Sequence, residues 1–449
     1  MTTTYDFVAI GGGNSGLTAA GRIAAAGRRV ALVDRGPVGG LCSLNGCNPK
    51  KVLVRSTEVL DEIRRAARFG IDVGPPRIDW SRVIDRKDSF TSGVTDATER
   101  SLAEQGIDLL RGSPRFTGRN ELEVSGRRIH AGGILVATGS TPRPLEFPGA
   151  ELVRTTDDIL ALREVPRSLV VIGAGVVAFE FGQVFARLGA QVTVLAPQGR
   201  ALAGHDPELV EHVLRVSAEL GIRVRWDAPV RAVRRGGDRL SVDCEAGGTK
   251  ETLPADFVLN AAGRVPSIDG LDLGAADVAT APRGVLVNDY LRSPSNPGVF
   301  AAGDAHGRLQ LSPIASYEGR VVARNFLEGD VERVEYGAVP KVLFTVPQLA
   351  AVGVTEPEAQ KRGLRVEVAR HDMSGWKVYA IDGEPVAYAK VITEPGTGRI
   401  LGAHLLAPNA GELILPYALA IRFGITADEL RGVVYGYPTL TSALPYTLR

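Results

Sequence analysis

The feature that most constrains the fold of this chain is a glycine-rich turn between an apolar run and a helix. Residues 7–10 are apolar and lead directly into Gly11, Gly13 and Gly16, and a helix-compatible stretch follows. A second apolar run then ends on Asp34. This order is typical of a dinucleotide-binding unit, in which the glycines let the backbone approach a pyrophosphate and the acid accepts from the ribose hydroxyls.

The same unit recurs at residues 168–195, where a Gly-x-Gly-x-x-Ala turn contains Gly173 and Gly175. Its second strand ends in Ala196 instead of an acid, so no carboxylate repels a 2′-phosphate and NADP is not excluded. Arg200 is the nearest cation for that phosphate, with a solvated loop charge as the alternative interpretation. Two such units predict an α/β fold with two nucleotide cofactors.

Two of the three cysteines, Cys42 and Cys47, lie five positions apart in a helix-compatible stretch. On a regular helix their Cα atoms would be roughly 8–9 Å apart. A disulfide allows only roughly 4.4–6.8 Å. A bridge would therefore need a distorted helix, which Gly46 and Pro49 permit. A strained bridge is easily reduced, as a catalytic disulfide must be, whereas the alternative is a pair of unrelated thiols.

Composition excludes several other classes of protein. Three cysteines in 449 residues do not form a secreted disulfide framework, and Cys244 is predicted to be structural because no histidine or cysteine lies at metal-ligand spacing. A net charge of +1 gives no electrostatic footprint for nucleic acid or an anionic membrane. No apolar run approaches the roughly 18 residues that a membrane span needs, so a cytoplasmic protein is predicted. No metal site is predicted either.

The remaining chain is read as alternating helices and strands. Helices are predicted at 52–68, 80–105, 311–326, 412–423 and 427–431, and strands at 109–129, 134–140, 239–245, 298–304, 386–393 and 399–406.

Five ordered motifs resemble the flavoprotein disulfide reductase family, which includes glutathione reductase, dihydrolipoamide dehydrogenase and mercuric reductase. They lie at residues 11–16, 42–51, 173–180, 299–304 and 345–353, and so extend over essentially the whole chain. The resemblance implies two Rossmann-like domains, for FAD and for NADPH or NADH, and an α+β C-terminal domain that forms a homodimer. The implied boundaries are 1–145 with 265–333 for FAD, 146–264 for NAD(P) and 334–449 for dimerisation.

The resemblance also implies residue roles. Cys47 would be the thiol next to the flavin and Cys42 the interchange thiol, while Lys51 would pair with Glu180 and favour the Cys47 thiolate. The implied FAD residues are Gly11, Gly13, Asn14, Ser15, Gly16, Asp34, Gly40, Lys51, Thr138, Gly139, Asp304, Ile314 and Ala315. The implied NAD(P) residues are Gly173, Gly175, Val176, Val177, Glu180, Arg200 and Gly263.

The C-terminus departs from the family pattern. Disulfide-reducing members carry a His-Pro-Thr-x-Ser-Glu acid/base motif, but this chain has Tyr437 and Ser442 at the histidine and glutamate positions. A tyrosine hydroxyl is a poor base at pH 7, although it can donate a hydrogen bond. Mercuric reductases also lack this dyad but end in paired cysteines, and no cysteine follows Cys244 here.

We therefore expect an FAD-dependent NAD(P)H oxidoreductase whose small-molecule electron acceptor needs no histidine base: a quinone, a metal ion, oxygen or an activated disulfide. One alternative is a specialised small-molecule disulfide reductase or dithiol oxidase that uses Tyr437. Another, of a different class, is an FAD-bound redox sensor without turnover.

Overall fold

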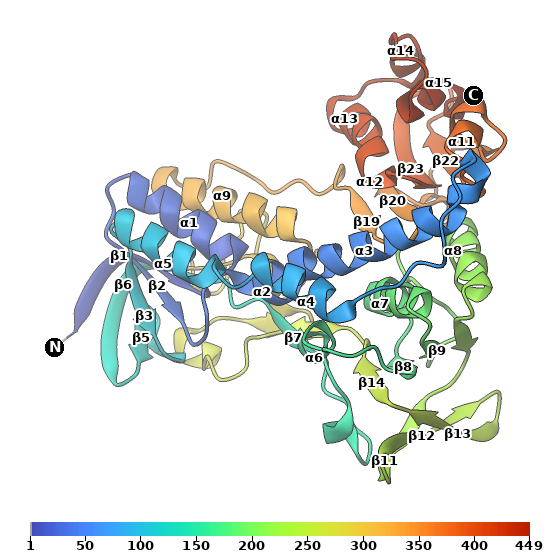
Figure 1. The fold of residues 1–449 in the computed structure, drawn as a ribbon. Coiled ribbons are helices and arrows are strands. Elements are labelled where there is room, and N and C mark those ends of the chain that lie inside the picture. The colour runs from blue at the N-terminus through green and yellow to red at the C-terminus, as the bar shows by residue number, and fades with distance from the viewer. Residues whose placement is uncertain (1) are drawn as a thin grey trace.

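The computed structural model describes residues 2–449, and its first sheet forms around the first glycine turn (Figure 1). The order is β3-β2-β1-β6-β5-β4, and β18 also pairs with β6. Parallel pairs join β1, β2, β3, β6 and β18, so the chain leaves this sheet and returns to it after the second unit. The strands are β1 (Thr3–Ile10), β2 (Val30–Asp34), β3 (Asp108–Arg111), β4 (Pro114–Gly118), β5 (Glu121–Val124), β6 (Arg127–Val136) and β18 (Val299–Ala301).

Helices α1 (Asn14–Ala25) and α9 (Ser312–Glu328) lie side by side against this sheet (Figure 1). Their small and branched residues, including Ala19 and Val321, pack on Phe7 and Phe300 in one apolar cluster. The packing brings the start of α9 to the first glycine turn, although the two segments are far apart in sequence.

The second unit has a parallel sheet of order β10-β9-β8-β14, flanked by an antiparallel sheet of β11, β12 and β13. Cys244 is buried on β12, in agreement with its predicted structural role. The elements are β8 (Ser168–Ile172), α7 (Val176–Arg187), β9 (Gln191–Leu195), α8 (Pro207–Glu219), β10 (Arg223–Arg225), β11 (Val230–Gly236), β12 (Arg239–Ala246), β13 (Thr249–Ala255) and β14 (Phe257–Asn260).

The C-terminal part is a five-stranded antiparallel sheet of order β19-β20-β23-β22-β21 with helices around it. The strands predicted at 386–393 and 399–406 are confirmed as β22 and β23, which pair with each other. The elements are β19 (Lys341–Leu343), β20 (Gln348–Gly353), α10 (Glu356–Lys361), β21 (Glu367–Asp372), α11 (Lys377–Ile381), β22 (Tyr388–Thr393), β23 (Ile400–Ala407), α12 (Ala410–Leu413), α13 (Leu415–Phe423), α14 (Ala427–Arg431) and α15 (Leu444–Thr447).

Helix α3 (Cys47–Arg65) runs from the first sheet to the junction of the other two parts (Figure 1). It follows α2 (Gly40–Asn45) and starts five residues earlier than predicted. Helix α3 therefore contacts all three parts of the chain.

Short strands β7 (Ser140–Pro142) and β15 (Arg264–Pro266) pair where the chain passes between the first and second units.

Two predicted helices are each broken in two. Residues 80–105 form α4 (Trp80–Ser89) and α5 (Val94–Glu104), with Gly93 at the N-cap of the second helix. The helix predicted at 412–423 splits into α12 and α13, and Pro416 stands in the first turn of α13, where its missing N–H is tolerated. The α/β fold class is confirmed, while the exact domain boundaries stay a prediction. No helix among residues 2–449 is long and apolar enough to cross a membrane.

Candidate active site

The first glycine turn leaves no room for side chains. A Cβ on Gly16 would lie 1.9 Å from the Gly11 carbonyl oxygen, and Gly11 itself has a φ of +113°. No side chain among residues 2–449 caps the first turn of α1, which begins after Gly13. Its amides, including those of Asn14 and Ser15, are therefore available to an anion, and the helix dipole favours one.

The surroundings of this turn fit the adenosine end of a dinucleotide. A cavity of about 220 Å³ adjoins it and is lined by Gly11, Asp34 and Thr138, among others. Asp34 accepts hydrogen bonds from the backbone N–H groups of Gly12 and Gly36, at 2.6 and 2.8 Å. The buried Thr138 Oγ1 has no hydrogen-bond partner within residues 2–449, so this hydroxyl is left for a ligand.

A second group of predicted FAD residues borders the same turn. A Cβ on Gly40 would lie 2.6 Å from Gly13 Cα, which shows how closely α2 approaches the turn. Gly139 has a φ of +70° directly before β7. Ile314 and Ala315 lie near the start of α9.

Asp304 lies beyond β18 in a polar group that the sequence did not reveal. Ser140 Oγ donates to Asp304 Oδ2 at 2.6 Å, and Arg264 Nε donates to Ser140 Oγ at 2.8 Å. Burial raises the pKa of Asp304. Because Ser140 and Arg264 lie on β7 and β15, the carboxyl is tied to the crossing between the first two units.

The second glycine turn has the same construction. A Cβ on Gly173 would lie 2.3 Å from the Ala261 carbonyl oxygen, and α7 begins directly after Gly175. The backbone N–H of Leu202 donates to the Ala174 carbonyl at 2.9 Å, which ties the following loop to the turn. Arg200 is exposed on that loop and donates to Gln198 Oε1 at 3.3 Å.

The other predicted nucleotide residues flank this turn. Val176 and Val177 form the first turn of α7, and Val176 is 39% exposed. Gly263 has a φ of +101° directly before β15. Both glycine turns are therefore sterically and electrostatically suited to a dinucleotide pyrophosphate.

The cysteine stretch contains the distorted helix that the spacing predicted for a bridge. Helix α2 ends at Gly46, whose φ and ψ of −135° and −114° are not helical, and α3 begins at Cys47. A Cβ on Gly46 would lie 2.7 Å from the Leu41 carbonyl oxygen and 3.2 Å from Cys42 Cα. The break folds the two cysteines toward each other, and the structure shows both as thiols.

The environment of the two thiols separates their acidities. A hydrogen bond with Cys42 lowers the pKa of Cys47 to about 6, with smaller contributions from Ser312 and the Lys50 ammonium. The same hydrogen bond, with burial, raises the pKa of Cys42. Ser312 Oγ lies 3.2 Å from Cys47 Sγ. Sequence reasoning missed Ser312, although a Ser-Pro pair at a predicted helix start marks an available hydroxyl.

The predicted pairing of Lys51 with Glu180 is wrong. Lys50 Nζ lies 2.5 Å from Glu180 Oε2, whereas Lys51 lies 3.5 Å from Glu58 and over the ring of Phe344. Consecutive residues point about 100° apart around a helix, so only one of them can face α7. Lys50, three residues after Cys47, is therefore the lysine that pairs with the buried Glu180 carboxylate.

Tyr437 lies far out on the surface, with 69% of the residue exposed. Ser442 Oγ donates to the Thr439 carbonyl at 2.6 Å, and Thr439 Oγ1 donates to the Gly436 carbonyl. The segment that replaces the acid/base motif thus bonds to itself. Among residues 2–449 no group of three His, Cys, Asp or Glu side chains is placed to hold a metal ion.

Comparison with protein families gives two matches. Residues 5–319 match the model described as pyridine nucleotide-disulphide oxidoreductase. Residues 339–447 match the dimerisation domain of the same group. The two models together cover both nucleotide turns, the cysteine pair and the C-terminal sheet.

Curated relatives and solved structures agree with these matches. A mercuric reductase of Bacillus cereus is 32% identical over 444 residues, covering 98% of this chain and 70% of that enzyme. A dihydrolipoyl dehydrogenase of Thermus scotoductus is 34% identical over 445 residues, covering 98% and 96%. The HOCl-induced flavoprotein disulfide reductase RclA of Escherichia coli superposes with a TM-score of 0.88 at 26% identity, covering 99% of both chains.

Proposed function

Since this chain belongs to the pyridine nucleotide-disulphide oxidoreductase family, we propose that it passes electrons from NAD(P)H to the Cys42–Cys47 pair and on to an acceptor that needs no protein base. The chain is an NAD(P)H-dependent flavoprotein oxidoreductase with FAD as its second cofactor. Its C-terminal dimerisation domain indicates a homodimer.

The proposed binding roles follow the two glycine turns. The turn at Gly11 and the carboxylates of Asp34 and Asp304 would hold FAD, and the turn at Gly173 would hold the nicotinamide nucleotide. Arg200 would contact a 2′-phosphate, which favours NADPH as the donor. When bound, FAD supplies the route by which two electrons from the nicotinamide reach the cysteines.

The observation that carries the proposal is the unequal acidity of the two cysteines. Two electrons and one proton convert the disulfide into a thiolate and a thiol, and the charge is favoured on Cys47 because its pKa is lowered to about 6. Cys42 keeps its proton because its pKa is raised. A protonated Cys42 is a poor nucleophile, so attack on an ordinary disulfide would require a base.

No base of that kind is supplied by the 437–442 segment. A metal ion, a quinone or oxygen can accept electrons without this attack. An activated disulfide has a good leaving group, so its reduction depends less on a base. The relatives favour a metal ion, since mercuric reductase is named for one and RclA has been solved as a Cu(II) complex. Cys42 and Cys47 are the paired cysteines of this sequence, so we expect a metal ion to react at this pair.

The test is steady-state turnover with NADPH and NADH against Hg²⁺, Cu²⁺, a quinone, oxygen, glutathione disulfide and lipoamide. The proposal predicts turnover with at least one of the first four acceptors. Because the electrons pass through the Cys42–Cys47 pair, Cys42→Ser should lose this turnover. Turnover of glutathione disulfide or lipoamide at rates ordinary for the family would contradict it. Reduction without reoxidation by any acceptor would instead favour a redox sensor.

A further inference from the structure

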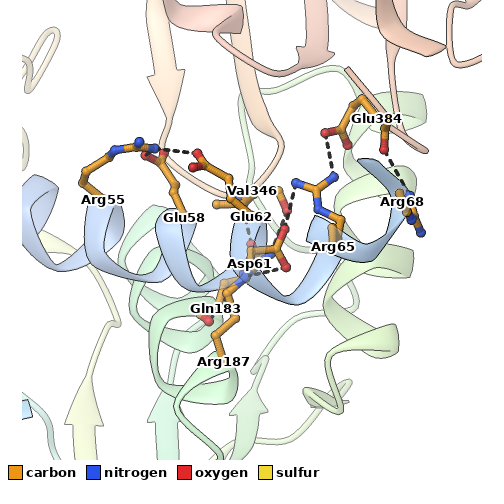
Figure 2. Close-up of polar contacts among 11 residues, drawn as sticks. Arg55, Glu58, Asp61, Glu62, Arg65, Arg68, Gln183, Arg187, Val346 and Glu384 are labelled. Atoms are coloured by element: carbon orange, nitrogen blue, oxygen red, sulfur yellow. Dashed lines mark hydrogen bonds and ion pairs between the residues drawn. The ribbon is translucent and has the colours of Figure 1, made fainter. Parts of the chain in front are cut away.

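Arg187, at the C-terminal end of α7, is a buried cation that joins three separate elements (Figure 2). Only 3% of it is exposed. Its guanidinium donates to Gln183 Oε1 at 3.0 Å and to the Val346 carbonyl at 3.1 Å, and Nε lies 3.7 Å from Asp61 Oδ1 on α3. A buried charge is stabilised only when it is paired and hydrogen-bonded, so this position requires its partners.

The same face of α7 also carries Glu180. Residues three, four and seven positions apart share one helix face, so Glu180, Gln183 and Arg187 form a row. Glu180 Oε1 accepts from the Phe344 N–H at 2.8 Å, and Gln183 Oε1 accepts from the Val346 N–H at 3.0 Å. The row therefore binds two N–H groups and one carbonyl of the segment between β19 and β20.

Helix α3 meets this row at two points. Lys50 contacts Glu180, and three turns further on Asp61 contacts Arg187. The Arg64 guanidinium donates to the Arg187 carbonyl at 3.0 Å, next to the second point. Leu53 and Val54 of α3 also belong to the apolar cluster that contains Phe181 of α7, and the two polar contacts add a defined register to this packing. Asp61 is itself held by Arg65, which reaches Glu384 (Figure 2).

We propose that Arg187 is a positioning residue for the Lys50–Glu180 pair, because its bonds to Gln183, Val346 and Asp61 hold α7 in register with α3. Arg187 stands two helical turns from Glu180 and acts through the helix, without contact to substrate or cofactor. The inference rests on the proposed function, in which the Lys50 ammonium favours the Cys47 thiolate and Glu180 holds Lys50 in place. Its consequence is that the passage of electrons from NAD(P)H to the Cys42–Cys47 pair depends on a residue outside both nucleotide turns.

The experiment compares holoenzyme variants Arg187→Met and Asp61→Asn with Lys50→Met as the positive control. We expect both clamp variants to slow anaerobic flavin reduction at saturating NADPH by on the order of tenfold, since small misplacements of reacting groups are costly. The nucleotide Kd should change little. Hydrogen exchange of the segment containing Phe344 should accelerate, although its N–H is bonded to Glu180 and not to Arg187. Arg187→Lys should restore part of the rate, because it keeps the charge opposite Asp61.

Glu62→Gln is the matched control, since it breaks the exposed Arg55–Glu62 ion pair within α3, which does not involve α7. It should leave both flavin reduction and the exchange at Phe344 unchanged. A folded Arg187→Met enzyme with the wild-type rate and exchange would overturn the proposal, and so would an equal slowing by Glu62→Gln. Should Arg187→Met fail to fold, Asp61→Asn decides by the same two measurements. If Lys50→Met also reduces at the wild-type rate, the proposed role of the Lys50–Glu180 pair fails first.

Discussion

The cysteine site and the segment at 437–442 are held in opposite ways. Cys47 contacts Ser312 across 265 positions of sequence, and Lys50 contacts Glu180 across 130. The side-chain hydrogen bonds of the 437–442 segment, by contrast, join residues two or three positions apart. Long-range contacts therefore fix the groups that receive electrons, whereas the polar side chains in place of the acid/base motif bond only to their near neighbours in sequence, although Leu440 packs on the C-terminal core.

This difference indicates that the chain retains the groups that stabilise a thiolate but not the base used in disulfide interchange. Stabilising a thiolate needs donors and a cation fixed around one sulfur, and these are present around Cys47. Disulfide interchange also needs a base, and neither a histidine at position 437 nor a glutamate at position 442 is present to supply one. The two regions are consistent with an enzyme that accumulates electrons on the cysteine pair and releases them without a proton relay.

The largest effect is expected when the Lys50 cation is removed from the cysteine site. Lys50→Met should slow flavin reduction by NADPH about 10²-fold, because it leaves the buried Glu180 carboxylate unpaired and disturbs the groups around Cys47. The measurement is stopped-flow absorbance under anaerobic conditions. Lys51→Met is the adjacent control and should change the rate less than about threefold. Equal effects of the two substitutions would contradict the assignment of Lys50.

The opposite change would supply the exposed segment with the missing relay. Tyr437→His combined with Ser442→Glu should raise turnover of glutathione disulfide or lipoamide about tenfold, the low side of what an acid/base contributes because the segment is not otherwise adapted. Turnover with metal ions or quinones should stay the same. Tyr446→His, at another exposed tyrosine, serves as the control. No gain in disulfide turnover would mean that the missing dyad is not what limits this chemistry.

Ser312→Ala sharpens the account of the thiolate. Removing the hydroxyl takes a hydrogen bond from the charged form of Cys47, so the pKa should rise by about one unit. The pKa of this thiol is lowered in the structure, and its thiolate is lost as pH falls through about 6. The variant should lose it at a higher pH. Absorbance of the reduced enzyme against pH measures the midpoint, which Ser316→Ala on the same helix should leave in place.

The smallest effect is expected at Tyr437. Tyr437→Phe should alter turnover with metal ions, quinones or oxygen less than about twofold, because an exposed hydroxyl contributes little. A larger loss, with disulfides as the preferred acceptors, would favour the alternative in which this tyrosine handles protons.

Local pattern was enough to predict the turns but not their partners. Gly11, Gly173 and the break at Gly46 follow from short-range sterics, so their surroundings could be read from neighbouring residues. Lys50 and Lys51 have the same chemistry and adjacent positions, and only the packing of α3 against α7 decides which one meets Glu180. The single helix predicted at 80–105 was wrong, because α4 ends at Ser89 and α5 begins only at Val94, after the N-cap Gly93.

The sequence could not predict which residues from distant elements would contact the site. Ser312 reaches Cys47 only because α9 packs beside α1, and Arg187 meets Asp61 only after three parts of the chain assemble. On α7 the row of Glu180, Gln183 and Arg187 is visible as polar positions on one face of an otherwise apolar helix. That pattern indicates a buried polar contact but does not name its partner.

The most direct test of the central claim is an anaerobic NADPH titration followed from 400 to 700 nm, with Cys42→Ser beside the wild type. The account predicts that the first two electrons give the wild type a long-wavelength thiolate-to-flavin band above about pH 6 while the flavin stays oxidised. Cys42→Ser, which has no disulfide to reduce, should bleach its flavin with the same two electrons. Bleaching of the wild type without such a band would contradict the account and leave the cysteine pair a bystander.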